Sequence, residues 1–526
     1  MPYPYSGPPP VRPSAQPCHN VRDYSAAGDG VSLDTAAINR AIGDCHRSGG
    51  GTVFFPAGTY LTGTLELLGN VALHLDAGAV LRGSPRLEDY RTLPFASELR
   101  NSALLFADGA VNIAITGHGA IDGNADAFGI DGEADTWRDF DAVRTRQGAA
   151  YLAVNDLPDD GPVKHRARPG ILILLLRCRE VVVRDIKLVN APNWGLHVAC
   201  SEGVLLTGLE IHSSLLLPNS SGLDVSLSRN VRISDCNIEA GDDAIAFSPC
   251  ADGFGGGVAE NITVENCILL ARSAAIRIGW GAHDFRNLLF NNIVIRDSNR
   301  GILINLRYGE RMENLVFSNI VIASRLYKGK WWGKGEPIHI SALAELEGEP
   351  RRRVLRNVTF TNITATGDHG IVLYADDGST IEDVTFDRVR ITVQPGPLQE
   401  SFGGNFDLRP VWDPARRVFA HDIPALFARG VARLALRDFA VEWAEGLPDF
   451  CRHAIELEHF GEVTIDGFRG RQARLGAAGS DAAIVVRDGR SAVIRNSTLT
   501  PGGQQLVAAA RVTAVESDVA RRAAAS

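Results

Sequence analysis

The chain has 526 residues, a formal net charge of −9 and 22% charged residues, a composition typical of a soluble globular protein. The acidic balance argues against a nucleic-acid partner, which would favour a basic face. No stretch approaches the roughly 18 apolar residues that a membrane span requires, so no membrane partner is expected either.

The first 20 residues are rich in proline and contain no apolar core. Successive prolines lack amide donors and fix φ, so residues 1–20 are predicted to form an extended tail. As written, this segment is not a secretory signal. We therefore expect a cytoplasmic protein, or a secreted or periplasmic one if a leader has been trimmed.

The first element predicted in chain order is one amphipathic helix. Apolar residues recur at helical spacing from Ala37 to Cys45, after a capping candidate, Asp34, and the pattern ends at the glycines 49–51. A helix before the first strands of a stacked array can cover its open end, which would otherwise expose apolar residues. We predict that this helix caps the fold.

From Thr52 onwards, short strand patterns repeat between glycine, asparagine and aspartate turns. Eight of them begin at residues 181, 204, 231, 262, 288, 315, 358 and 384, and most spacings are 26 or 27 residues. Each unit holds two or three strand-length segments and no helix-length segment. This pattern predicts an all-β fold, a parallel β-helix that forms a single domain over residues 21–515, followed by a frayed tail over 516–526.

Asparagine precedes the strand in five of these units. Asparagine tolerates left-handed backbone, and its amide can bond along the stack, so these residues predict a ladder of turns. They are Asn230, Asn261, Asn287, Asn314 and Asn357.

The longest interruptions of the repeat are residues 124–169, 325–352 and 394–430. Insertions in a solenoid tend to project from one side and shape the binding face. The eight cysteines form no CxxC pair, and several lie inside strand patterns, which favours small buried side chains over disulfides or zinc ligands. No metal or other cofactor is required by any motif, although carboxylate clusters in β-helices can hold Ca²⁺.

The candidate chemistry lies between residues 218 and 249. Asp224 ends one strand pattern, and the adjacent pair Asp242 and Asp243 starts the next. Coils stack at the strand spacing, roughly 4.8 Å apart, so these carboxylates should converge on one surface. Paired carboxylates are what glycosidic bond hydrolysis needs. The alternative is that the GDD sequence is merely a turn.

Several stretches, taken together, are more specific: DYSAAGDGVSLDTAAINRAI, GGGTVFFPAGTYLTGTL, GHGAIDG, PNSSGLDV and GDDAIAFS. With them the chain resembles the polygalacturonase-like enzymes, glycoside hydrolase family 28, over nearly its whole length. The resemblance implies a right-handed parallel β-helix that hydrolyses pectin-type polysaccharides with inversion. It implies that Asp242 is the general acid and that Asp243 helps to activate water, while Asp224 shares or supports the base role.

The chain departs from the family pattern at the expected base. The family's NTD triplet appears here as Asn219-Ser220-Ser221, so Ser221 stands where a water-activating aspartate is expected. Asn219 and Ser221 are kept as substrate-binding candidates. Losing one acid still leaves an acid and a base, so we expect a lower rate or a changed substrate.

Two further family segments are altered. The GHG segment is matched by residues 273–275, with Ala274 in place of its histidine. The RIK segment, whose Arg and Lys bind the uronate carboxylate, aligns with residues 303–305, and both cations are gone. Guanidinium groups grip carboxylates bidentately, so nearby basic residues are the candidate replacements. These are Arg277, His283 and Arg307.

An aromatic and cationic cluster marks the second insertion, where Trp331 and Trp332 lie close to Lys334 and His339. Sugar rings pack on aromatic faces, and the alternative for a tryptophan is to fill the core. We expect one of the pair to point inward and the other toward substrate. Trp194, one coil before Ser221, is a further candidate platform.

These observations predict an exo-acting, inverting glycoside hydrolase whose partner is an oligosaccharide or polysaccharide, with a substrate other than polygalacturonate as one outcome. The first alternative is a β-helix polysaccharide lyase or epimerase, in which Arg277, Lys334 or His283 would neutralise a carboxylate. The second is a non-catalytic glycan-binding protein, which Ser221 and Ala274 favour.

Overall fold

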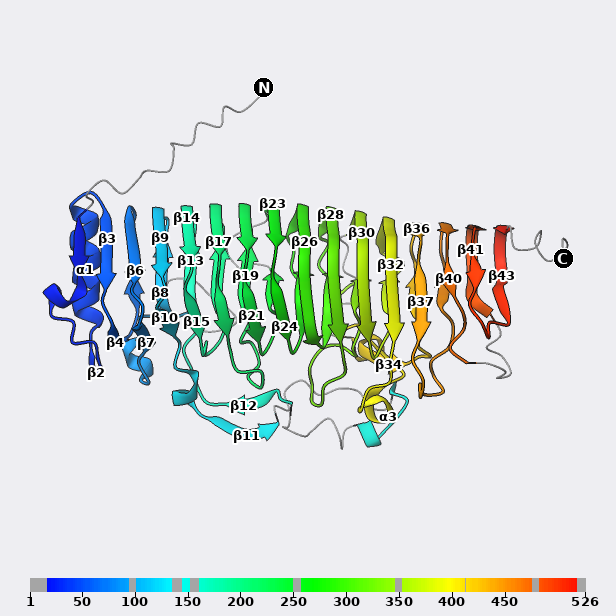
Figure 1. The fold of residues 1–526 in the computed structure, drawn as a ribbon, viewed down its shortest axis with the longest axis horizontal. Coiled ribbons are helices and arrows are strands. Elements are labelled where there is room, and N and C mark those ends of the chain that lie inside the picture. The colour runs from blue at the N-terminus through cyan, green and yellow to red at the C-terminus, as the bar shows by residue number, and fades with distance from the viewer. Residues whose placement is uncertain are drawn as a thin grey trace, which may run out of the picture.

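The structure is a computed structural model that describes residues 17–93, 101–134, 144–151, 160–248, 257–345, 352–411, 413–474 and 482–517. In these ranges, 39 strands form one continuous set of parallel hydrogen-bonded pairs. Figure 1 shows them as a row of stacked coils with a helix at the N-terminal end. The predicted fold, a right-handed parallel β-helix, is confirmed.

Each coil contributes strands to up to three sheets. Sheet 1 contains β5 (Leu65–Glu66), β8 (Ala103–Asp108), β13 (Ile171–Leu176), β16 (Leu196–Ala199), β19 (Leu223–Ser226), β22 (Ile245–Phe247), β25 (Ala274–Gly279), β27 (Arg300–Leu306), β29 (Ile338–Ala342), β31 (Ile371–Ala375), β35 (Leu426–Arg429) and β38 (Ile455–Glu458).

Sheet 2 contains β1 (Cys18–Asn20), β3 (Gly51–Phe55), β6 (Val71–Leu75), β9 (Val111–Gly117), β14 (Arg179–Arg184), β17 (Glu202–Thr207), β20 (Arg229–Ser234), β23 (Val258–Glu265), β36 (Arg433–Arg437) and β39 (Glu462–Asp466). Sheet 3 contains β2 (Asp29–Leu33), β4 (Gly58–Thr62), β7 (Ala79–Gly83), β10 (Ala120–Asp122), β15 (Lys187–Val189), β18 (Glu210–His212), β21 (Asn237–Ala240), β24 (Ile268–Ala271), β37 (Ala440–Trp443), β40 (Arg469–Gly470) and β42 (Thr498–Leu499).

Six long strands run from one sheet into the next. Sheets 2 and 3 share β26 (Asp284–Ser298), β28 (Arg311–Ser324), β30 (Arg353–Gly367) and β32 (Ser379–Val393), while sheets 1 and 2 share β41 (Ala482–Arg495) and β43 (Gln505–Ser517).

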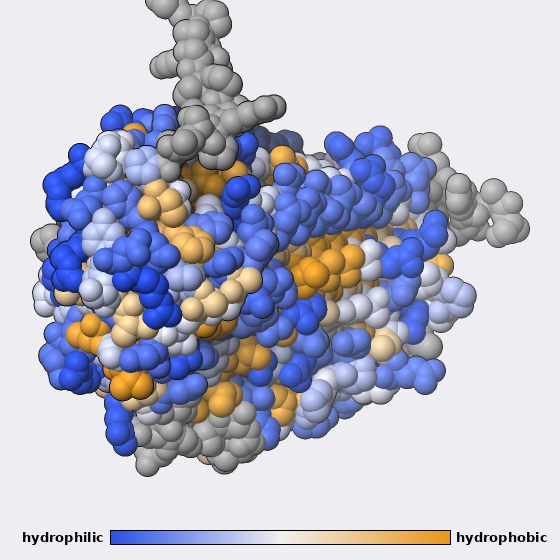
Figure 2. Space-filling model, turned by 60° about the vertical axis from the view of Figure 1, so that its left-hand side comes forward, coloured by the Kyte–Doolittle hydropathy of each residue, from blue (hydrophilic) through white to orange (hydrophobic). Residues whose placement is uncertain are grey.

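The interior of the coils is apolar and stacked in register. Four phenylalanines illustrate this, with adjacent ring centroids 4.7 to 4.8 Å apart and rings within 9° of parallel. They are Phe290, Phe317, Phe360 and Phe386. The spacing equals the strand spacing, so identical residues at one position of successive coils pack face to face. On the outside, Figure 2 shows mostly hydrophilic side chains around a streak of apolar ones that follows the solenoid.

The predicted asparagine ladder is present. Each of its five members has a positive φ between 55° and 61°, and each side-chain amide after the first donates to the previous asparagine at 2.9 to 3.4 Å. The turns of these coils are therefore tied together along the axis.

The predicted N-terminal helix is α1 (Thr35–Arg47), and its apolar stripe is buried against β1, β3 and β5. The carboxylate of Asp34 makes no capping bond to the helix. It accepts instead from the amides of Ala27 and Gly28 at 2.6 and 2.9 Å, so Asp34 occupies the predicted N-cap position but does not cap the helix with its side chain. Strand β1 pairs with β3, so ordered structure begins inside the segment predicted as a tail. Residues 1–16 lie outside the described residues.

The short elements belong mostly to the insertions. They are η1 (Val21–Tyr24), η2 (Leu87–Asp89), η3 (Ala125–Phe128), α3 (Gln399–Phe402), α4 (Pro414–Arg417) and the antiparallel pairs β11 (Ile130–Ala134) with β12 (Val163–His165) and β33 (Asn405–Asp407) with β34 (Val418–Ala420). Figure 1 shows β11, β12 and α3 on the same side of the solenoid.

The three insertions meet one another. Tyr151, Leu326 and Phe402, one from each, form a small buried cluster of their own. Asn405 donates to Gln147 at 2.9 Å, and Arg146 donates its backbone amide to Asn405 at 2.8 Å. These contacts connect segments about 260 positions apart in the sequence into one covering structure.

Among the seven cysteines in the described part of the chain, five are buried and none forms a disulfide, and Cys250 lies outside it. Within the same residues, no helix is long and apolar enough to cross a membrane.

Candidate active site

The three predicted acids lie on two neighbouring coils of sheet 1. Asp224 is the second residue of β19, and Asp242 and Asp243 stand just before β22. The amide of Gly222 donates to the carbonyl of Asp243 at 3.0 Å, so the two strands start side by side. In register, the row on the outer face of sheet 1 runs His197, Asp224, Ala246, Arg277, Leu303, His339.

Asp243 is buried and paired with a cation. Its Oδ2 accepts from Nε of Arg277, and its Oδ1 accepts from the amide of Ala274 at 3.0 Å. Arg277 also donates to Oγ of Ser248 at 2.8 Å and to the carbonyl of Gly279 at 3.1 Å. Burial alone would lower the pKa of Arg277, but Asp243 and the other two acids raise it. The pair is therefore a fixed carboxylate and guanidinium.

Asp224 is fully buried, and neither of its oxygens accepts a hydrogen bond of good geometry from the described residues. Burial raises its pKa well above 3.8, and Asp243 and Asp242 act in the same direction. The charge of Arg277 and the nearby Ser248 hydroxyl oppose this increase without cancelling it. The environment favours the protonated carboxyl, which cannot act as a base.

Asp242 is the partly exposed acid of the three. Its Oδ2 accepts from the backbone amide of Asn219 at 3.1 Å, so Asn219 enters the site through its main chain. Ser221 is 2% exposed and precedes Gly222, whose amide bonds to Asp243. The structure thus brings the predicted Asn219, Ser221 and Arg277 together with the acids.

Trp194 and His197 border the acids on the N-terminal side. Their rings meet edge to face, with centroids 5.0 Å apart, and Trp194 is partly exposed. Nε2 of His197 lies 2.8 Å from Oγ of Ser226, and burial lowers the pKa of this histidine to about 3. Trp194 therefore offers an aromatic face one coil from Ser221 and two coils from Asp243.

The other predicted cations lie elsewhere. Arg307 is fully buried and donates to the carbonyls of Leu408 and Pro410 at 2.9 and 2.6 Å, so it holds the third insertion against sheet 1. Burial lowers its pKa to about 10, despite Glu345 and Glu310. His283 is 9% exposed and directly precedes β26. Neither residue is presented beside Asp242.

Trp331 is buried, as expected for one of the pair, and Trp332 is partly exposed, while the expectation that it faces substrate stays a prediction. Nε1 of Trp331 donates to the carbonyl of Asp160 at 2.7 Å. Trp332 packs edge to face on Trp280, with ring centroids 5.5 Å apart.

Lys334 and His339 are buried beneath the insertions. Nζ of Lys334 lies 3.8 Å from Asp407 and 5.6 Å from the ring centroid of Tyr151, and burial lowers the pKa of Lys334 to about 8. Burial lowers the pKa of His339 to about 4, and its Nδ1 lies 3.5 Å from Glu336. Both residues are part of the covering structure.

Sequence patterns did not reveal Arg300 and Asp407, which form a buried charged group with Glu336. Arg300 donates to the carbonyls of Asp407 and Arg409 from the third insertion and to Glu336 from the second. The only available signal was an arginine at the start of a strand in which most positions are apolar.

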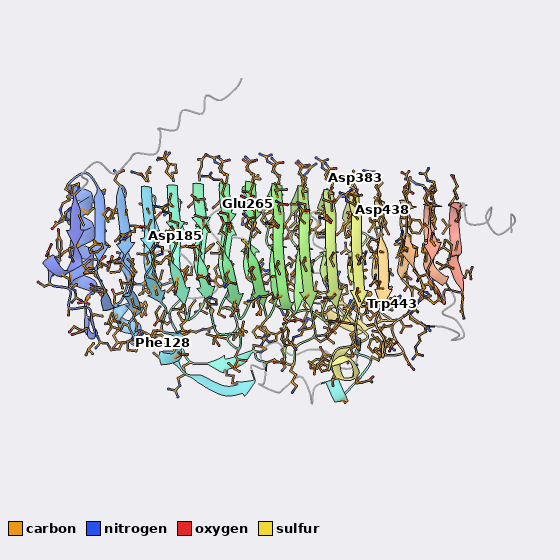
Figure 3. All side chains as sticks on the ribbon, in the orientation of Figure 1. Phe128, Asp185, Glu265, Asp383, Asp438 and Trp443 are labelled. Carbon is orange, nitrogen blue, oxygen red and sulfur yellow. The ribbon has the colours of Figure 1, made fainter. Side chains whose placement is uncertain are left out.

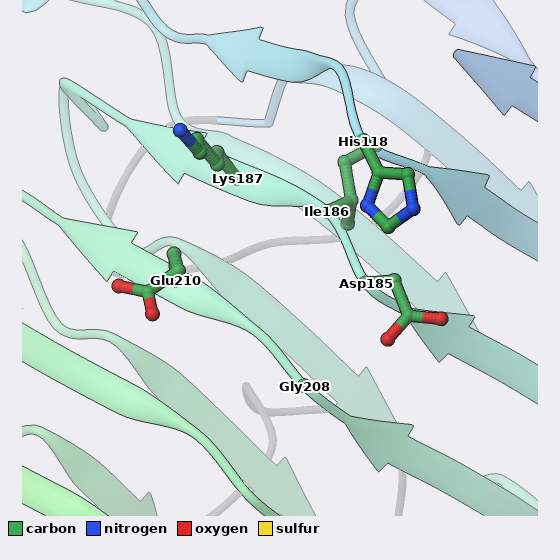
Figure 4. Close-up of a pocket in the computed structure, with 6 residues that line it drawn as sticks. All are labelled: His118, Asp185, Ile186, Lys187, Gly208 and Glu210. Atoms are coloured by element: carbon green, nitrogen blue, oxygen red, sulfur yellow. The ribbon is translucent and has the colours of Figure 1, made fainter. Parts of the chain in front are cut away.

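A hollow of about 350 Å³ is lined by His118, Asp185, Ile186, Lys187, Gly208 and Glu210 (Figure 4). These residues belong to sheets 2 and 3 and their connections, and none is in the acid cluster. Figure 3 shows Asp185 among the stacked strands and Phe128 close to the paired strands β11 and β12.

Among the described residues, no group of three or more His, Cys, Asp or Glu side chains is arranged to hold a metal ion.

Residues 92–322 match the model of glycosyl hydrolases family 28, and residues 18–141 match that of rhamnogalacturonase A/epimerase, pectate lyase-like proteins. A probable polygalacturonase of Vitis vinifera is 26% identical over 308 residues, 55% of this chain and 56% of the relative. An exo-poly-alpha-D-galacturonosidase of Dickeya chrysanthemi is 25% identical over 370 residues, 59% of this chain and 60% of the relative. The matched region spans less than two thirds of either relative.

The chain is similar to the polygalacturonase-like proteins of glycosyl hydrolase family 28.

Two solved structures have the same fold. An exopolygalacturonase of Thermotoga maritima has a TM-score of 0.55 and 23% identity, covering 72% of this chain and 87% of that one. A family 28 exopolygalacturonase of Yersinia enterocolitica has a TM-score of 0.57 and 19% identity, covering 93% of this chain and 79% of that one.

In the structure, the motif positions that differ from the family 28 pattern surround Asp243. Ser221 lies beside it in the preceding coil, and Ala274 in the next coil offers only its amide. Arg277, three residues after Ala274, supplies the cation that contacts this acid. Relative to the family pattern, the chain therefore lacks an aspartate at Ser221 and a histidine at Ala274, and Arg277 balances the negative charge of Asp243.

Proposed function

We propose that the protein is an inverting glycoside hydrolase acting on pectin-type polysaccharides or their oligosaccharides. The observation that carries the proposal is that the two adjacent acids have different environments. Asp242 is partly exposed, whereas Asp243 is buried in an ion pair with Arg277. One carboxyl group that meets substrate and one that stays charged are the two parts that acid–base cleavage requires. The names of the relatives from Vitis vinifera and Dickeya chrysanthemi support the substrate class.

In the proposed reaction, Asp242 donates a proton to the glycosidic oxygen as the bond to the anomeric carbon breaks. Asp243 accepts a proton from a water molecule that attacks the same carbon from the opposite face, which inverts its configuration. Each oxygen of Asp243 keeps a lone pair beyond its bonds to Arg277 and Ala274, so the carboxylate can still accept from water. Asp224 stays protonated and supports the other two.

We also propose exo action. The insertions are packed together over sheet 1 from β27 onward, where Arg300 and Arg307 bond to residues 407–410. The amide of Arg300 bonds to Ser273, one coil after Asp242, so the covered part begins close to the acids on their C-terminal side. A chain blocked on one side is cleaved near its end. The relative from Dickeya chrysanthemi is itself named an exo-enzyme.

The proposal is tested by product analysis with oligogalacturonides and a panel of neutral and rhamnose-containing oligosaccharides. Asp242→Asn should lower the cleavage rate at least about 100-fold, the scale of general acid catalysis. The matched control is Asp185→Asn, which changes an exposed aspartate outside the cluster and should leave the rate unchanged. An unsaturated product would mean elimination, and cleavage that survives Asp242→Asn would refute the assignment.

A further inference from the structure

Two arginines share one tyrosine ring close to the acids. The guanidinium carbons of Arg272 and Arg325 lie 3.9 and 4.2 Å from the ring centroid of Tyr327. The ring is buried, and its hydroxyl donates to the carbonyl of Asp297, while both arginines are partly exposed. Stacking on an aromatic face orients a guanidinium group without using its N–H donors.

Neither guanidinium group is neutralised. Within the described residues, neither has a carboxylate oxygen within 4 Å, and Nε of Arg272 is buried without a hydrogen-bond partner. Asp160 and Asp297 act on the pair only through space. Burial lowers the pKa of Arg272, and the charge of Arg325 lowers it further. Two like charges held together in this way are stabilised by a bound anion.

The pair lies next to the acid cluster. Arg272 directly follows β24, and its amide donates to the carbonyl of Ala240 at 3.2 Å, while that of Ser273 donates to Asp242 at 3.4 Å. Arg272 thus stands one coil, about 5 Å, from the coil that carries Asp242. Arg325 approaches from the C-terminal side, where its amide donates to the carbonyl of Ser298 at 3.0 Å.

We propose that Arg272 and Arg325, stacked on Tyr327, bind the carboxylate of a uronic acid residue beside the bond that is cleaved. The inference rests on the proposed function and deepens it, because it names the anionic group of the substrate and the residues that recognise it. A guanidinium group presents paired donors that match a carboxylate. The pair takes over from the cations that are absent at residues 303–305.

The test compares two ligands on one protein. Binding of trigalacturonate and of its carboxyl-reduced, neutral counterpart is measured by titration calorimetry with the full chain carrying Asp242→Asn, which prevents turnover. Adding Arg272→Gln or Arg325→Gln should weaken trigalacturonate binding about tenfold each, the scale of a lost charged hydrogen bond. Binding of the neutral ligand should not change, which also shows that the variants are folded.

The matched control is Arg232→Gln, which removes an exposed arginine on β20 and should change neither affinity. Equal weakening of both ligands, an unchanged affinity for trigalacturonate, or no binding of trigalacturonate without the substitutions would each overturn the inference. If trigalacturonate binds through these arginines but the wild-type chain cleaves nothing, the hydrolase proposal fails and the anion site stands. If the wild-type chain cleaves trigalacturonate and substitution of the two arginines does not change cleavage or binding, the anion site fails and the hydrolase proposal stands.

Discussion

Arg277 changes the charge balance of the acid cluster more than any other residue. Its position in β25 is in register with Ala246, two coils from Asp224 in the same row, and its guanidinium group reaches Asp243. Both partners are buried, with side chains 7% and 4% exposed. Removing one partner of such a pair leaves an uncompensated charge in the interior.

We therefore expect Arg277→Met to lower the free energy of unfolding by about 3–5 kcal/mol. Adding Asp243→Asn to that variant should restore most of the loss, because the buried charge is then gone. Urea unfolding of the single and double variants measures this. A double variant that is less stable than Arg277→Met would contradict the coupling.

Asp224 makes stability depend on pH. Its folded-state pKa is raised above 3.8, so its contribution to stability is fully present below about pH 4 and is lost as the pH rises toward the folded-state pKa. Asp224→Asn removes this loss. At pH 7 the variant should be more stable than the wild type by at least about 1 kcal/mol, and the difference should shrink to near zero at about pH 3.5.

Scanning calorimetry across this pH range provides the measurement, with Asp185→Asn as the control for losing an exposed aspartate. A stabilisation that is the same at both pH values would mean that Asp224 does not titrate as described.

At the scale of elements, the insertions convert an open sheet into a site covered on one side. Arg300 begins β27 and Arg307 directly follows it. Both bond to backbone carbonyls of residues 407–410, so two buried side chains fix the third insertion.

Arg307→Met should release this segment. The expected result is a larger share of internal cleavage on a long polymer, together with a loss of about 3–5 kcal/mol of unfolding free energy. Chromatography of early products measures the first effect. The control Arg433→Met removes an exposed arginine on β36. Release of single sugars alone from the Arg307 variant would show that the insertion does not determine exo action.

The elements that repeat could be predicted from the sequence, because the same local physics recurs in every coil. The asparagines from Asn230 to Asn357 predicted their own turns, and the stripe from Ala37 to Cys45 predicted α1. The insertions could not be predicted in the same way, because Tyr151, Leu326 and Phe402 meet across hundreds of residues without a shared pattern.

In the site, too, some features could be predicted from the sequence and others could not. Motif spacing located Asp224, Asp242 and Asp243, whereas burial decides what each basic residue does. Arg277 and Arg307 both looked like ligands for a substrate carboxylate, but one pairs with Asp243 and the other holds a loop. Arg272 and Arg325 stand out only when their shared ring, Tyr327, is seen.

At the scale of the whole molecule, stability comes from contacts between neighbouring coils. Phe317 is fully buried between Phe290 and Phe360, with ring centroids 4.7 and 4.8 Å away. Phe317→Ala should cost about 3–5 kcal/mol of unfolding free energy. Leu289→Ala, at an exposed position of β26, should cost less than about 0.5 kcal/mol. Equal effects in urea unfolding would contradict the stacked core.

The most direct test of the central claim is the anomeric configuration of the first product, followed by proton NMR immediately after enzyme is added to an oligogalacturonide. The account predicts that the new reducing end appears with the configuration opposite to that of the cleaved bond, and that the signal is lost in Asp242→Asn. A product with retained configuration, or one that forms equally fast without Asp242, would contradict it.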